Sequence, residues 1–219
     1  MRKRTVKLTA CALALAVLAG CAGGGPASQS APAASESAAA PESVSESAAA
    51  SASQGAAEAE PVTLGAFSAN TLDGEAVDET IFSGYTLTVV NVWATFCGWC
   101  VDEMPVLSAL GEEYAADGVQ IIGIVNDTVG PDGAPDESQI ALAQDIVAEG
   151  GATYKNLALS EDLLQLGFAN LPAVPATLFF DGNGYTVGQG IVGAQDEDGW
   201  RALIEERLAM AAEQMEAMA

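Results

Sequence analysis

The residues of this chain best suited to chemistry are two cysteines at close spacing, in Cys97-Gly98-Trp99-Cys100. Two thiols three positions apart can form a disulfide and exchange it with another one, the first attacking as a thiolate and the second releasing the product. We therefore expect Cys97 to be the nucleophile and Cys100 the resolving thiol. The other two cysteines, Cys11 and Cys21, lie in the N-terminal segment, so we expect no other disulfide within the processed chain.

The segments around this pair predict a strand, a helix and a second strand. Residues 86–93 are rich in β-branched side chains and nearly continuously apolar, which is typical of a strand buried on both faces. From Cys97 to Tyr114 apolar residues recur at helical spacing, with Pro105 predicting a kink, and residues 119–125 form a second buried strand. The pair therefore lies at a helix N-terminus, where free N–H groups and the helix dipole stabilise a thiolate.

The remaining segments predict further elements of one α/β domain over residues 61–219. Asp73-Gly74 forms the turn of a hairpin between residues 62–71 and 75–78. A polar loop over 126–135 precedes a helix over 138–149, a short extended piece over 156–160 and one or two helical turns over 161–167. A second hairpin joins strands over 176–180 and 185–192, and an amphipathic helix over 197–215 ends the chain. Its inner side holds Trp200, Leu203, Ile204 and Leu208.

The N-terminal sixty residues predict a leader and a tether. Residues 1–20 have a basic start and an apolar run shorter than the roughly 20 residues of a membrane-spanning helix. Leu18-Ala19-Gly20-Cys21 resembles the lipobox of bacterial lipoproteins, which predicts cleavage and a lipid on Cys21. Residues 21–60 are low in complexity, rich in Ala, Ser and Glu, and too polar to form a core. An uncleaved anchor is the alternative, and both place the domain outside the cytoplasm at the cell membrane.

The charge of the chain restricts the classes of partner that it can bind. Thirty acidic residues stand against seven basic ones, and removal of residues 1–20 leaves only Lys155, Arg201 and Arg207 as basic residues. Such a field repels nucleic acid, so we expect no nucleic-acid partner. The charge favours solubility, with selection of basic partners as the alternative. The chain contains no histidine, which disfavours a zinc or copper site, and we expect no metal and no cofactor.

The residues from Val90 to Pro105, VNVWATFCGWCVDEMP, resemble the signature of membrane-tethered thioredoxin-like disulfide reductases of the TlpA and ResA type. The resemblance extends more loosely from Leu64 to Leu208. It implies a thioredoxin fold, a mixed central sheet flanked by helices, with an N-terminal β-hairpin extension and a helical insertion. It also implies that Pro175 is cis and lies against the cysteine pair, that Val174 pairs with an extended partner peptide, and that Trp99 borders the same groove.

Glu103 stands where these relatives have an acidic residue that acts near the cysteines. The resemblance implies a role in proton transfer, and a solvated helix carboxylate is the alternative. Asp102 and Glu103 disfavour a nearby thiolate, which favours a reductant over an oxidant. Asn91 replaces the buried aspartate of thioredoxin itself and agrees with the tethered group.

The function expected from these features is extracytoplasmic thiol–disulfide exchange by a reductant. Its partners would be disulfide-containing secreted or membrane proteins and a membrane thiol electron donor, in cytochrome c maturation or in redox repair of the envelope. One alternative is a thiol peroxidase, although the proline and threonine motif of such relatives is missing from Asn91–Phe96. Another is a binding module whose cysteines only lock a loop. Activity on protein disulfides separates these hypotheses.

Overall fold

The computed structural model describes residues 60–219. The predicted leader, residues 1–20, and the predicted tether, residues 21–60 with its lipid-bearing Cys21, lie outside the described residues apart from Glu60. Both remain predictions. Within residues 60–219, no helix has the length and apolar character needed to cross a membrane.

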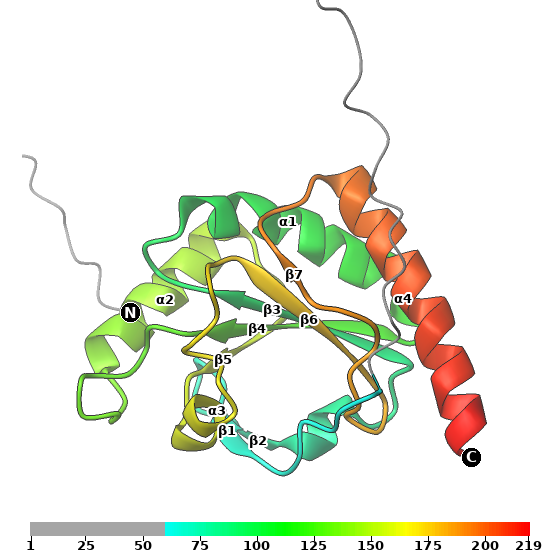
Figure 1. Ribbon diagram of the computed structural model, residues 1–219. Helices are drawn as coiled ribbons and strands as arrows, with labels where there is room; N and C mark the ends of the chain where they lie inside the picture. The colour runs from blue at the N-terminus through cyan, green and yellow to red at the C-terminus, as the bar shows by residue number, and fades with distance from the viewer. Residues whose placement is uncertain (1–59) are drawn as a thin grey trace, which may run out of the picture. The chain divides into compact units, whose positions relative to one another are not determined.

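A five-stranded mixed sheet lies at the centre of the domain (Figure 1). Its strands, in spatial order, are β5 (Lys155–Ala158), β4 (Val119–Val125), β3 (Leu87–Trp93), β6 (Ala176–Asp181) and β7 (Ile191–Val192). The first three run parallel to one another, and β6 and β7 are antiparallel to their neighbours. The parallel β3–β4 pair confirms the predicted β–α–β unit around the cysteines.

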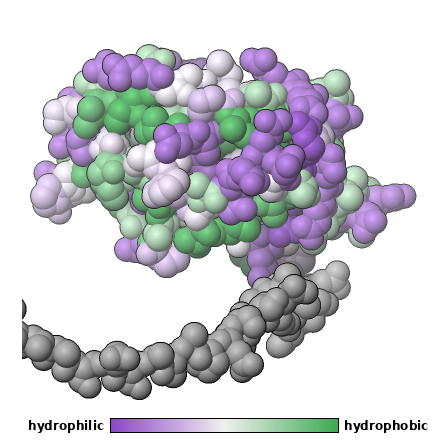
Figure 2. All heavy atoms as spheres, turned by 90° about the horizontal axis from the view of Figure 1, so that it is seen from above, coloured by the Kyte–Doolittle hydropathy of each residue, from purple (hydrophilic) through white to green (hydrophobic). Residues whose placement is uncertain are grey.

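Helices and a small hairpin cover the two faces of this sheet (Figure 1). One face carries α1 (Gly98–Glu113), α2 (Glu137–Gly150) and α4 (Glu197–Met218), and the other carries α3 (Glu161–Gln165) and the hairpin of β1 (Ser68–Asn70) and β2 (Ala76–Asp78). Two short 3₁₀ turns, η1 (Glu79–Phe82) and η2 (Ala115–Asp117), complete the elements. Hydrophilic side chains cover much of the helical face (Figure 2), in keeping with the acidic composition.

All seven residues of β3 are buried, because the strand packs on both faces. Val90 and Val92 join the cluster formed with the hairpin and α3. Leu87 and Val89 join the cluster that contains Trp200 of α4. A third cluster surrounds the two cysteines at the end of β3. The continuous apolar run of the sequence is therefore explained by two cores, one on each face.

The predicted strand over 185–192 is wrong in extent, since only Ile191–Val192 is a strand. Tyr185 and Thr186 make isolated bridges to other segments. The chain turns at Gly188, whose φ is +62°, and the guanidinium of Arg207 fills the space beside it, 2.9 Å from where a Cβ would lie. The first predicted hairpin is present with its Asp73-Gly74 turn, although its strands are only three residues long.

Candidate active site

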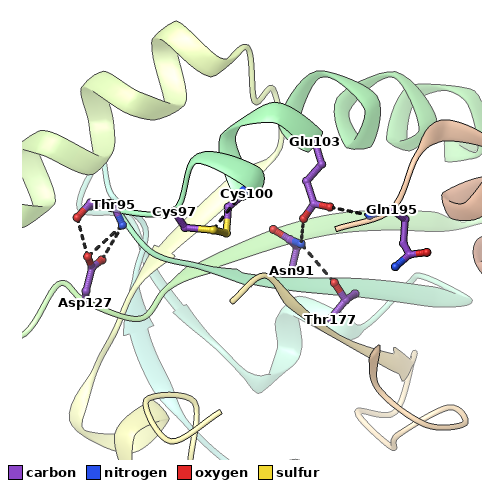
Figure 3. The surroundings of a disulfide bond; sticks show 8 residues. All are labelled: Asn91, Thr95, Cys97, Cys100, Glu103, Asp127, Thr177 and Gln195. Atoms are coloured by element: carbon purple, nitrogen blue, oxygen red, sulfur yellow. Dashed lines mark hydrogen bonds between the residues drawn. A yellow bond between two sulfur atoms is a disulfide. The ribbon is translucent and has the colours of Figure 1, made fainter. Parts of the chain in front are cut away.

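Cys97 and Cys100 are joined by a disulfide, with Cα atoms 5.3 Å apart (Figure 3). Cys97 caps the N-terminus of α1, and its sulfur accepts a hydrogen bond from the backbone N–H of Cys100 at 3.2 Å. Cys97 is 8% exposed and Cys100 is fully buried. The order of accessibility agrees with the predicted roles. Cys97 is largely enclosed, because Leu72 and Val174 belong to the cluster packed around the pair.

The surroundings give a thiolate on Cys97 the support of a helix N-terminus and little more. The first N–H groups of a helix have no partner within it, and they carry its partial positive charge. The three basic residues in the described part of the chain, Lys155, Arg201 and Arg207, each pair with a glutamate. Within residues 60–219, therefore, no basic side chain remains unpaired to stabilise the thiolate.

The turn that leads into Cys97 is held by a carboxylate from the neighbouring strand. Asp127, just after β4, accepts hydrogen bonds from the backbone N–H of Thr95 at 3.0 and 3.1 Å and from its hydroxyl at 2.6 Å (Figure 3). Asp127 was not among the residues predicted from the sequence. The available signal was its position: parallel strands end at the same sheet edge, so a polar residue after β4 lies beside the end of β3.

Glu103 is on α1, one turn beyond Cys100, and its side chain is buried, with only 3% of the residue exposed. Its Oε1 accepts a hydrogen bond from Asn91 Nδ2 at 2.8 Å, and its Oε2 accepts a longer one from the backbone N–H of Gln195 at 3.4 Å (Figure 3). The alternative of a solvated carboxylate is wrong. Burial raises the pKa of Glu103, and the hydrogen bonds from Asn91 and Gln195 partly offset this rise. The indole of Trp200 acts in the same direction, although its N–H has no acceptor within hydrogen-bonding geometry.

Asn91 connects this carboxylate to the segment that contains the predicted groove. Its Nδ2 donates a second hydrogen bond, to Thr177 Oγ1 on β6 at 3.2 Å. Two residues before Thr177, the Val174–Pro175 peptide bond is cis. Pro175 is buried, and Val174 packs against the cluster of the two cysteines. The structure thus brings Val174 to the disulfide, while the binding of a partner peptide there stays a prediction.

Two large aromatic side chains next to the cysteines face solvent. Phe96 is 79% exposed and Trp99 is 74% exposed. Phe96 lies in the short stretch between β3 and α1, and Trp99 lies in the first turn of α1, so both are beside the disulfide without forming part of the core. Phe96 therefore does not pack around the site. The predicted contact of Trp99 with a partner stays a prediction.

The sequence model of the AhpC/TSA family matches residues 63–185, more than half of the chain. The chain belongs to the AhpC/TSA family. The match covers strands β1 to β6, the cysteine pair and Pro175, so most of the site just described lies within the family's own region, while Gln195 and Trp200 follow it. No curated protein matches this AhpC/TSA chain significantly.

Many solved structures share the fold of this AhpC/TSA protein. A thiol:disulfide interchange protein of the thioredoxin family from Chlorobium tepidum TLS is 22% identical, with a TM-score of 0.55 over 69% of this chain and 99% of that one. A putative DsbE from Chlorobium tepidum is 18% identical, with a TM-score of 0.53 over 71% and 99%. A DsbF homologue from Corynebacterium diphtheriae is 20% identical, with a TM-score of 0.53 over 67% and 87%. At this identity the likeness shows the thioredoxin-like fold, which confirms the predicted fold class.

Family, fold and site together make this chain a thiol–disulfide oxidoreductase of the redoxin type with a Cys97–Cys100 pair. The helix N-terminus positions the sulfur of Cys97, and the buried Cys100 lies beneath it. The carboxylate of Glu103, three residues further along α1, is on the same buried side of the helix as Cys100. These parts suffice for transfer of two electrons and two protons between a dithiol and a disulfide.

Proposed function

We propose that the protein is an extracytoplasmic, lipid-anchored reductant of protein disulfides. The observation that carries this proposal is the disulfide at the N-terminus of α1, with Cys97 the more accessible sulfur and Cys100 fully buried. The TlpA and ResA resemblance of Val90–Pro105 supports the tethered reductase class. The solved structures of similar fold include proteins described as thiol:disulfide interchange proteins, which also supports it.

The reaction starts from the reduced pair. The thiolate of Cys97 attacks one sulfur of the partner's disulfide, forming a mixed disulfide and releasing the other partner sulfur as a thiolate that takes a proton. Cys100 then loses its proton to Glu103, and its thiolate attacks the sulfur of Cys97. The second partner sulfur leaves and is protonated. Two electrons have passed to the partner, and Cys97 and Cys100 are again a disulfide.

The partner segment would bind in extended form beside Val174 and Pro175, with Trp99 at the rim. The support for this arrangement is the packing of Val174 against the cysteine cluster and the exposure of Trp99. An extended peptide adding to a strand gains main-chain hydrogen bonds that do not depend on its sequence. Such binding suits a protein that acts on many secreted or membrane proteins.

The direction of electron transfer follows from how weakly the site stabilises the thiolate of the reduced cysteine pair. The described basic residues are paired with glutamates elsewhere, and the carboxylates of Glu103 and Asp127 lie near the pair and disfavour a thiolate. A strong oxidant owes its potential to a stabilised thiolate. We therefore expect a reduction potential near the value of about −270 mV typical of thioredoxin, and a value near the roughly −120 mV of strong oxidants would overturn the assignment.

The proposed location at the membrane rests on the predicted lipid at Cys21 and on a membrane thiol donor that restores the dithiol. Cytochrome c maturation, with apocytochrome c as the substrate, and recycling of envelope sulfoxide reductases are the two roles that fit such a donor. Cys21→Ala is expected to release the protein from membranes or to block processing of its leader. An unchanged membrane fraction would remove the anchor from the proposal.

Reduction of insulin disulfides tests the catalytic part directly, with the full chain carrying Cys11→Ala and Cys21→Ala so that the active pair supplies the only thiols. Cys97→Ser is expected to abolish turnover, and Cys100→Ser to accumulate a mixed disulfide with insulin. Turnover that survives Cys97→Ser, or a wild type that is inactive with a competent reductant, would instead favour the binding module. Hydrogen peroxide as substrate in the same assay tests the peroxidase alternative.

A further inference from the structure

One buried acceptor next to the site has no partner. Asn91 is fully buried in the middle of β3, and its Nδ2 donates to both Glu103 and Thr177. Its Oδ1 is equally buried and accepts no hydrogen bond. A buried polar atom without a partner is destabilising and uncommon in proteins. A function for the oxygen in another state of the site would explain why it is retained.

The hydrogen bonds around Glu103 suit only its ionised form. Both carboxylate oxygens face N–H donors, Asn91 Nδ2 and the backbone of Gln195. The indole N–H of Trp200, close by, is also only a donor. A protonated carboxyl group carries an O–H that needs an acceptor, and none of these three groups provides one. Protonation of Glu103 therefore requires a rearrangement of its neighbours.

The other titratable group that faces Glu103 is Tyr154, from the segment before β5. Burial first, and then the charge of Glu103, raise the pKa of its hydroxyl, so Tyr154 stays neutral. That hydroxyl is buried and makes no hydrogen bond, so it lies near the carboxylate without binding it. Asp102, next to Glu103 on α1, is exposed. The amide of Asn91 is left as the group in contact with Glu103 that can change from donor to acceptor.

We propose that Asn91 is a positioning residue that serves both protonation states of Glu103 by rotating its terminal amide. With Glu103 ionised, Nδ2 donates to Oε1, as observed. When Glu103 takes the proton of Cys100, the rotated amide presents Oδ1 to accept the new O–H. The inference rests on the proposed role of Glu103 as that proton acceptor.

The rotation keeps both hydrogen bonds of the amide, while Nδ2 takes the place of Oδ1 as the buried atom without a partner. The oxygen and nitrogen of an amide have nearly the same size, and the terminal torsion of asparagine is broad. The hydroxyl of Thr177 can accept from Nδ2 or donate to Oδ1, because a hydroxyl does both. Each orientation thus keeps a hydrogen bond to Glu103 and one to Thr177. No backbone movement is required, so the proton can be held and released within the buried site.

The decisive measurement is a pair of NMR spectra of the oxidised full chain, above and below the titration of the Glu103 carboxyl carbon. Nuclear Overhauser contacts between the Asn91 amide protons and the Glu103 γ protons are expected above the midpoint and are expected to vanish below it. Contacts that persist on both sides overturn the proposal. Asn156 is the matched control, because both ends of this buried amide are bonded, to Trp93 Nε1 and to the Tyr154 carbonyl. Its contacts should not change.

A kinetic test uses 5-thio-2-nitrobenzoate attached to Cys97 as a coloured leaving group that Cys100 displaces. Asn91→Leu is expected to slow its release about tenfold, the effect of one lost hydrogen bond, and an unchanged rate counts against the proposal. Thr88→Val, another buried substitution on β3, is the control and should leave the rate unchanged. If Glu103→Gln keeps the wild-type rate, the proton-acceptor role fails, while the NMR measurement still decides whether Asn91 rotates.

Discussion

The carboxylate of Asp127 binds Thr95 by both its backbone N–H and its hydroxyl, and so joins the end of β4 to the turn before Cys97. The backbone of Asn126 donates to Trp93 beside this contact at 2.9 Å, and Cys97 N–H donates to Ala94 at 3.0 Å. The backbone leading to Cys97 is therefore held by residues just after β4, which follow it in the sequence only after the whole of α1.

Loss of this anchor should weaken both the fold and the reaction. Asp127→Ala removes hydrogen bonds to a half-buried carboxylate and is expected to cost about 1–2 kcal/mol of unfolding free energy, together with a slower reduction of insulin. Asp127→Asn keeps an acceptor oxygen and should recover much of the stability. Urea unfolding of the oxidised protein measures this. Asp145→Asn, an exposed carboxylate on α2, is the control, and equal losses in the Asp127 and Asp145 variants would contradict the anchoring role.

Glu103 should make stability depend on pH. Burial raises the pKa of this carboxyl above its ordinary value of 4.5, so between the two values the folded protein binds more protons than the unfolded chain. Stability then falls as the pH rises through that range and is highest below it. Unfolding by urea at a series of pH values should show that the unfolding free energy of Glu103→Gln rises relative to that of the wild type from about pH 4.5 upward. The same curve for Glu149→Gln, an exposed glutamate on α2, should follow the wild type. A Glu103 variant that follows it too would contradict the prediction.

Gly123 on β4 should tolerate no side chain. A Cβ there would lie 1.9 Å from Asn156 Oδ1 and 3.1 Å from Trp93 Nε1, the two atoms joined by the buried hydrogen bond under the cysteine cluster. Gly123→Ala is expected to lower the unfolding free energy by about 1–3 kcal/mol. Gly98→Ala is the control, because a Cβ at Gly98 meets no atom within 4 Å and alanine favours a helix. Thermal unfolding compares them, and a neutral Gly123 variant would refute the clash.

The exposed aromatic side chains should act in binding and not in folding. Trp99→Ala and Phe96→Ala are expected to change stability by no more than about 0.5 kcal/mol, as for other surface positions, and to raise the KM for a protein disulfide with a smaller effect on kcat. Leu142, exposed on α2, provides the control substitution Leu142→Ala, which should alter neither. A large loss of stability in Trp99→Ala would place this side chain in the core after all.

The local parts of the fold were readable from the sequence because they depend on neighbouring residues. The β-branched run before Cys97 and the helical spacing after it predicted β3 and α1, and both are present. The strand predicted over 185–192 failed for the opposite reason. Its pattern suited a strand, but the chain turns at Gly188 beside the guanidinium of Arg207, a contact with a distant helix that the local pattern does not contain.

The cysteine pair and its place at a helix N-terminus were determined by the sequence alone, since spacing and periodicity act over a few residues, and the thioredoxin-like fold was implied by the resemblance of Val90–Pro105 to a known family. The tertiary structure decided what surrounds the pair. The contact of Glu103 with Asn91 depends on α1 packing on β3. The contact of Asn91 with Thr177 depends on strands β3 and β6 meeting across 86 residues of chain. Asp127 reaches Thr95 because parallel strands end at one edge. Such contacts arise from packing of the whole domain, and no local pattern records them.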